Sequence, residues 1–328
     1  MAGFSHARSG LVFFKGEYHL FYQFNPTTTH WAAPHWGHAV STDLAHWHDL
    51  PIALAPDDLG YIFSGSAVHD HTSRHDLTAI FTHAGPRGQV QSLAFSSDRG
   101  RTWTKYAANP VLAPPAEAPR PDFRDPKVRW HAESGSWVMV LAVGDRVHFY
   151  VAADLTSWRL ASEFGADAGF HSGSTWECPD LFPVRHAGAT HWVLLVSVNS
   201  GGPNGGSGTQ YFVGGFNGSH FVSASPPDAV RWLDYGRDDY AGVTFAHAPE
   251  GRVLFIGWLS NWAYANTVRR HSVRTRRSLR TVKVPLCTPL KRGASAPTAT
   301  ADPDSRLRCR ARYRACACRC RRPAGAPQ

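Results

Sequence analysis

Apolar and polar residues alternate along most of the first 265 residues, in short runs separated by Gly, Pro, Asn and Asp. Alternation with a period of two predicts β-strands, and the separating residues favour tight turns. Clear examples are "LVFFKGEYHLFYQF", "WVMVLAVGDRVHFYVAAD" and "RVLFIGWLS". Amphipathic helices of about ten residues are essentially absent from the pattern. The chain is therefore predicted to be all-β.

A turn motif recurs in this pattern, in which a strand end is followed by Asp, a short turn and Trp. "STDLAHW" ends at Trp47, "SSDRGRTW" at Trp103 and "AADLTSW" at Trp158, and "GFNGSHF", ending at Phe221, resembles a fourth copy. The Asp is expected to cap the turn, and the Trp to fill the space between neighbouring sheets. A four-stranded unit repeated about every 50 residues indicates a β-propeller, here with five blades. The alternative is a β-sandwich in which the turns are alike by chance.

Charge and cysteine divide the 328-residue chain into two parts. The net charge is +9, but residues 269–328 hold 17 of the 34 Lys and Arg residues and only 2 of the 25 Asp and Glu residues. Only Cys178 lies outside this basic tail, so the body is expected to fold without disulfides. We predict an atypical N-terminal segment (1–9), a five-bladed propeller domain (10–267), and a basic, Cys- and Arg-rich tail (268–328) that is non-native or disordered.

Three features invite other functional interpretations. "CACRC" lacks the second cysteine pair and the spacing of a zinc site, and the Arg runs lack the aromatic platform or recognition helix of a nucleic-acid binder. The spacing of the histidines between residues 30 and 48 follows strand alternation. We therefore expect no metal, no cofactor and no nucleic-acid partner. No run of 18 apolar residues and no signal peptide is visible, so no membrane partner is expected either.

Two carboxylates lie just before predicted strands, where propeller ligand sites gather. Asp125 follows Arg124 in "FRDPKVRW", and Glu177 lies between apolar neighbours in "STWECPDLFP". Burial would raise the pKa of Glu177 and suit it to donate a proton, while the adjacent cation would keep Asp125 ionised. Glycoside hydrolysis uses two carboxylates in such different roles. The alternative is that both side chains only cap turns.

The body resembles glycoside hydrolase family 32, the β-fructofuranosidases, which include levanases, inulinases and invertases. The resemblance covers residues 10 to 267 and rests on "GEYHLFYQFNP", "FSGSAV", "DFRDPK", "WECPDLFP", "DYGRDDYAGVT" and "GWLSNWAYAN", in the family's order. It implies a five-bladed propeller that hydrolyses terminal β-D-fructofuranosides with retention. Bacterial levanases look the most similar. The family's C-terminal β-sandwich domain is not visible in this sequence.

The resemblance also implies roles for individual residues. Glu177 matches the acid/base, and Asp125 matches the carboxylate that holds fructosyl hydroxyls and stabilises the transition state. The residues implied to bind the terminal fructose are Gln23, Trp31, Phe63, Ser64, Arg124 and Trp262. Packing between blades is the alternative for Trp31 and Trp262, and it is the expected role of Trp36.

One residue of the family pattern is missing. The family has W-M-N-D-P-N-G before the first hairpin, and alignment on Gly10 places Ala7 at the Asp that acts as nucleophile. The chain is therefore either an inactive binding relative or one whose residues before Gly10 are read out of frame. We favour the second explanation, because the Arg-, Ala-, Cys- and Pro-rich tail is what GC-rich DNA yields when it is read out of frame.

The predicted function is release of terminal fructose from levan, inulin or sucrose, impaired by Ala7. The expected partner is a small or polymeric β-fructoside. The alternatives are a non-catalytic fructan-binding propeller and a propeller glycosidase acting on another sugar. The family resemblance implies an extracellular or periplasmic protein.

Overall fold

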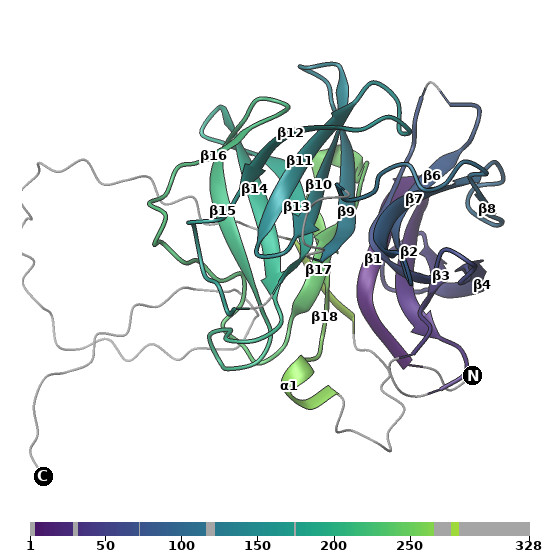
Figure 1. Cartoon of the computed structure of the whole chain (residues 1–328), viewed down its shortest axis with the longest axis horizontal. Coiled ribbons are helices and arrows are strands. Elements are labelled where there is room, and N and C mark those ends of the chain that lie inside the picture. The colour runs from purple at the N-terminus through teal and green to yellow at the C-terminus, as the bar shows by residue number, and fades with distance from the viewer. Residues whose placement is uncertain are drawn as a thin grey trace, which may run out of the picture. The chain divides into compact units, whose positions relative to one another are not determined.

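The computed structural model describes residues 4–28, 32–71, 73–115, 122–173, 175–265 and 277–281, with the backbone alone for 4–8 and 277–281. These residues form five antiparallel sheets in which strands that follow each other in sequence are neighbours (Figure 1). The prediction of an all-β protein is confirmed. Within the described ranges, no helix has the length and apolar character needed to cross a membrane.

Four of the sheets are complete four-stranded blades. Blade 1 contains β1 (Phe4–Phe14), β2 (Glu17–Asn25), β3 (His35–Ser41) and β4 (His48–Leu54). Blade 2 contains β5 (Tyr61–Val68), β6 (Leu77–Gly85), β7 (Gly88–Ser96) and β8 (Thr104–Lys105). Blade 3 contains β9 (Phe123–His131), β10 (Ser136–Val143), β11 (Arg146–Ala152) and β12 (Arg159–Phe164). Blade 4 contains β13 (Trp176–His186), β14 (Ala189–Val198), β15 (Gly208–Phe216) and β16 (Phe221–Ser223).

The fifth sheet has three strands in the described residues, β17 (Tyr240–Thr244), β18 (Leu254–Trp258) and β19 (Arg277–Thr281). A 3-10 turn (Pro249–Gly251) joins β17 to β18, and α1 (Trp262–Ala265) follows β18. The structure thus has four complete blades instead of the five predicted. Of the tail predicted for 268–328, only the backbone of β19 is described, and the rest lies outside the described residues.

The first strand of each sheet lies on the inside of the propeller-like arrangement. Each of these strands contacts the first strand of the next sheet, in the order β1, β5, β9, β13 and β17. The last of them, β17, contacts β1. Two backbone hydrogen bonds close this ring, from the Phe13 amide to the Ala246 carbonyl (2.9 Å) and from the Ala246 amide to the Leu11 carbonyl (2.8 Å). The ring brings residues from both ends of the body to a common centre.

The turn motif caps each of the four blades as predicted. Asp43, Asp98, Asp154 and Asn217 each accept backbone amide hydrogen bonds from residues two to four positions later. The indole nitrogen of the Trp in the first three copies donates to the carbonyl three residues earlier. These Trp side chains pack against the apolar clusters. The polar caps satisfy turn amides that would otherwise depend on water.

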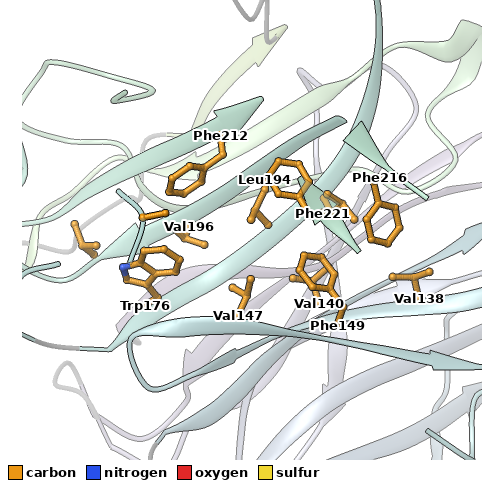
Figure 2. Packing of buried hydrophobic residues seen from close by; sticks show 13 residues of the cluster. Val138, Val140, Val147, Phe149, Trp176, Leu194, Val196, Phe212, Phe216 and Phe221 are labelled. Atoms are coloured by element: carbon orange, nitrogen blue, oxygen red, sulfur yellow. The ribbon is translucent and has the colours of Figure 1, made fainter. Parts of the chain in front are cut away.

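Apolar side chains fill the spaces between the blades. Figure 2 shows one such layer, in which Val140, Val147 and Phe149 of blade 3 face Leu194 and Phe212 of blade 4. These residues occupy alternate positions on their strands, so the sequence alternation places one face of each sheet in this layer. The buried clusters together run from blade 1 through to the fifth sheet.

Blade 1 and blade 2 are joined through a buried tryptophan. Trp36 is fully buried, and its indole Nε1 donates to the Phe63 carbonyl at 2.9 Å. Gly10 lies beneath this ring at a φ of +56°, and a Cβ there would lie 2.9 Å from Trp36 and 2.7 Å from Phe21. Only glycine satisfies both the backbone angle and the close packing. The expected packing role of Trp36 is confirmed.

Candidate active site

Every inner strand is bulged near the same end of the ring. Two residues of the inner strand there face one residue of its partner, at 10–11, 63–64, 125–126, 178–179 and 241–242. Asp125, Cys178 and Ala241 adopt positive φ angles of 63°, 47° and 51° at these bulges. A bulge redirects side chains out of the regular alternation. The bulges therefore direct neighbouring residues of several strands toward one region.

That region is a cavity of about 360 Å³ at the centre of the ring. Its lining combines three charged residues with amide, hydroxyl and aromatic side chains, a composition suited to a small polar ligand. The lining residues are Gln23, Phe63, Ser64, Gln89, Arg124, Asp125, Glu177, Cys178, Asn199, Tyr240, Ala241, Trp258 and Trp262. Both carboxylates predicted from the sequence thus face the same cavity.

Glu177 lies at the start of β13 with about 20% of its side chain exposed. Arg124 Nη2 donates to Glu177 Oε1 at 3.2 Å, and the Tyr240 hydroxyl donates to Glu177 Oε2. Burial raises the pKa of Glu177 to about 7 and outweighs the opposing effect of the Arg124 guanidinium. A carboxyl with such a pKa holds a proton near neutral pH and can donate it, as its apolar neighbours led us to expect.

Asp125 lies at the bulge of β9 and is 7% exposed. Its Oδ2 accepts a hydrogen bond from the Cys178 amide at 2.9 Å, and the Cys178 thiol lies 3.6 Å away. Its own amide donates to Thr82 Oγ1 at 3.0 Å. Residue 178 follows Glu177 directly, so this hydrogen bond connects β9 to β13 beside both carboxylates. The structure favours a shared site over the alternative of two unrelated turn caps.

Arg124 acts to lower the pKa of Asp125 as predicted, but this effect is not the largest one. The guanidinium forms ion pairs with Asp122 at 2.5 Å and with Glu177 at 3.2 Å. Burial raises the pKa of Asp125, and this effect exceeds the stabilisation of its charged form by the cation. The expectation of an ionised Asp125 rested on the neighbouring charge alone and did not weigh the burial of the carboxyl.

The residues predicted to bind the sugar are placed around the same cavity with one exception. Gln23 Nε2 donates to Ser64 Oγ at 3.0 Å, and both side chains are almost fully buried. Phe63 and Trp262 also line the cavity, and Trp262 packs against Trp258 with ring centroids 5.0 Å apart. The prediction for Trp31 falls outside the described residues.

Ala7 lies in β1, which begins at Phe4 rather than after Gly10. The backbone pairing jumps from His6 opposite Gln23 to Arg8 opposite Tyr22, so Ala7 occupies an extra position in the strand. Gln23 lines the cavity. The backbone of Ala7 therefore follows directly after the residue that pairs with Gln23.

Sequence reasoning missed the polar side chains of Tyr240 and Gln89, which line the cavity. Tyr240 lies within the quoted segment "DYGRDDYAGVT", yet only the fold brings its hydroxyl to Glu177. Gln89 accepts from the Phe123 amide at 2.8 Å and donates to Asp122 at 3.2 Å. These contacts cross between blades, and no spacing within the sequence indicates them. Among the described residues, no group of three or more His, Cys, Asp or Glu side chains is arranged to hold a metal ion.

Comparison with known proteins agrees with this geometry. The model of the Glycosyl hydrolases family 32 N-terminal domain matches residues 3–285. A levanase from Bacillus subtilis (strain 168) is 51% identical over 273 residues, which are 79% of this chain and 40% of the levanase. An exo-inulinase structure from Aspergillus awamori has a TM-score of 0.77 and 36% identity, covering 85% of this chain and 61% of that chain.

A structure of the β-fructofuranosidase from Schwanniomyces occidentalis, complexed with fructosyl-erythritol, has a TM-score of 0.74 and 39% identity. The match covers 81% of this chain and 54% of that chain. The chain thus spans about half the length of the relatives it matches. Since the family model and the identities extend over most of its residues, the chain belongs to glycosyl hydrolase family 32.

Proposed function

We propose that this chain binds the terminal fructosyl unit of a β-fructoside in the central cavity and carries the acid/base half of a retaining glycosidase. The observation that supports this most directly is that Glu177 and Asp125 line one cavity of about 360 Å³. Relatives at 36% to 51% identity include a levanase, an exo-inulinase and a β-fructofuranosidase. These names agree with a fructose-containing substrate.

Glu177 would protonate the oxygen that leaves with the rest of the substrate. Its pKa of about 7 supports this role, because the carboxyl keeps its proton until substrate arrives. Tyr240 and Arg124 each hold one of its oxygens, so the carboxyl has a fixed orientation. The Arg124 guanidinium would favour transfer of the proton from Glu177 to the leaving oxygen, because it stabilises the carboxylate that remains.

Asp125 would hold hydroxyls of the sugar and stabilise positive charge that develops on the ring. The Cys178 amide fixes its Oδ2, which leaves Oδ1 for a ligand hydroxyl. Gln23 and Ser64 present further polar atoms, and Trp262 offers an aromatic face to the apolar side of a sugar ring. The nucleophile position is Ala7, whose methyl side chain has no atom that can attack the anomeric carbon.

We therefore expect binding without efficient turnover in the unaltered chain. The Ala7→Asp variant should gain hydrolysis by roughly a thousandfold or more, because loss of a nucleophile generally costs at least that much. The assay is release of fructose from levan, inulin and sucrose, with calorimetry to measure binding of each substrate. Ala7→Asn is the matched control, since it adds the same volume without a nucleophilic carboxylate.

Specific outcomes would contradict the proposal. A folded Ala7→Asp variant that binds fructosides but releases no fructose would show that residue 7 is not the nucleophile position. Release of arabinose or xylose from their glycosides, with none of fructose, would support a propeller glycosidase of another specificity. In the active variant, adding Glu177→Gln should remove most of the gain, and an unchanged rate would reject Glu177 as the acid.

A further inference from the structure

The ring has a second cavity, of about 600 Å³, reached at the opposite ends of the inner strands. It is lined by residues 127–130 of β9, 182–183 of β13, and 244–248 at and beyond the end of β17. The starts of the same strands line the cavity that holds Asp125 and Glu177. The two cavities share no lining residue. The second cavity is therefore separate from the site that holds Asp125 and Glu177.

The walls of this cavity are mainly apolar and aromatic. Val68, Phe182 and Phe245 are buried in its lining. Trp130, which is 43% exposed, packs edge-on against the buried Trp137 at a centroid distance of 5.4 Å, and both rings line the cavity. Such walls favour a flat apolar group, since burying it removes apolar surface of both partners from water.

Arg129 brings a positive charge into this lining, and within the described residues it forms no ion pair. Its Nη1 donates to the Leu181 carbonyl at 2.9 Å, and its guanidinium lies 5.0 Å from the Trp192 ring centroid. Its Nε is buried and has no hydrogen-bond partner in the described part of the chain. No carboxylate of the described residues forms an ion pair with it. Burial lowers its pKa to about 10, so the group stays cationic at neutral pH.

The described carboxylates near Arg129 do not form an ion pair with it. Asp70 also lines the cavity, and no ion pair joins it to Arg129. Asp180 is the carboxylate that acts on Arg129 electrostatically, but Lys127 lies 3.2 Å from Asp180 and already neutralises it. Arg252, also in the lining, adds a second cation, and its carboxylate neighbour Glu250 is 3.6 Å away and mostly exposed. A cation that is partly removed from water normally has a carboxylate partner, because the loss of hydration is otherwise uncompensated.

We propose that this second cavity is a binding site for an organic anion, a carboxylate attached to a flat apolar body. The carboxylate pairs with the Arg129 guanidinium, which suits planar two-oxygen recognition. The apolar body lies against Trp130 and Trp137. The volume is within the range of small-molecule sites, about 300–1,000 Å³.

Isothermal titration of the full chain tests this proposal with two probes of one shape, 2-naphthoate and the neutral 2-naphthalenemethanol. Naphthoate is expected to bind at least about tenfold more tightly, because a hydrogen bond to a charged group is worth that factor or more. Arg129→Gln should remove this advantage and leave the affinity for the alcohol unchanged. Arg159→Gln, at an exposed position on β12, is the matched control and should change neither affinity.

Trp130→Ala gives an independent readout if Arg129→Gln lowers the melting temperature. It alters a side chain that is 43% exposed, and it should weaken both probes. Absence of naphthoate binding, equal affinity of the two probes, or unchanged affinity in a folded Arg129→Gln or Trp130→Ala variant would overturn the proposal. Displacement of naphthoate by fructose would also overturn it, because the probe would then occupy the catalytic cavity.

Discussion

The buried pair of Lys127 and Asp180 is predicted to be a major source of stability at the centre of the ring. Lys127 Nζ lies 3.2 Å from Asp180 Oδ2 and donates to the Thr244 carbonyl at 2.6 Å. The same Asp180 oxygen accepts from the Thr244 amide at 2.5 Å. The side chains are 8% and 0% exposed. The pair thus joins β9, β13 and β17, two residues after Asp125 in β9 and three residues after Glu177 in β13.

Lys127→Met should destabilise the chain far more than removal of a surface charge would. It leaves Asp180 buried without its cation, and breaking a buried pair in this way costs about 3–5 kcal/mol. For a domain of this size, each kcal/mol lowers the melting temperature by about 2–4 °C, so a decrease of about 6–20 °C is expected. The double variant Lys127→Met with Asp180→Asn should recover most of the loss, since it removes both charges and keeps an acceptor for the Thr244 amide.

Equilibrium unfolding in urea gives the free energy of unfolding of both variants, and the midpoint and the slope of each transition are reported separately. The same variants should lose affinity for fructosides if the pair also holds Asp125 and Glu177 in place. A Lys127→Met variant that is destabilised by less than about 1 kcal/mol would refute the reasoning. So would a double variant as unstable as the single one, because the loss could not then come from an uncompensated charge.

Three further predictions concern other parts of the fold. Folding raises the pKa of Glu177 from 4.5 to about 7, so as pH increases this group ionises in the unfolded chain before it ionises in the folded one. The unaltered chain should therefore lose stability relative to Glu177→Gln as the pH increases between those values. Urea midpoints of the two chains at pH 4.5 and 8 check this, and a difference between the midpoints that stays constant would contradict it. Trp36→Ala should cost about 3–5 kcal/mol by leaving a cavity between blades 1 and 2, and calorimetry showing a shift of less than 1 °C would reject that view. Asp98→Ala should cost about 1 kcal/mol by leaving turn amides without their cap, whereas Asp145→Ala, which breaks only an exposed ion pair, should be near neutral in the same denaturation assay.

Local features of the fold could be predicted from the sequence because their causes are local. Asp98 caps a turn that its own neighbours form, so the motif alone identifies it. Trp36 is a large apolar residue in a strand that is buried along almost its whole length, so its packing role could be expected. The number of strands in the last sheet could not be predicted in this way, since β19 comes after a long segment without clear alternation.

Part of the candidate site could likewise be predicted from the sequence, and part of it could not. The motifs around Asp125 and Glu177 indicated a shared cavity, and the ring of inner strands brings them together. The protonation of Asp125 could not be predicted from its neighbour Arg124, because the burial of the carboxyl depends on the assembled ring. The hydroxyl of Tyr240 reaches Glu177 only because the fifth sheet closes the ring, 63 residues further along the chain.

The bulges of the inner strands have a consequence for protein engineering. Ala241 adopts a φ of 51° in β17, close to the 63° of Asp125 in β9, and both lie at the same level of the ring. An acidic, basic or metal-binding side chain introduced at Ala241 would start from a backbone conformation similar to that of Asp125. These bulged positions of the inner strands thus have similar backbone conformations, and new reactions can be sought by changing the side chains there while the scaffold is kept.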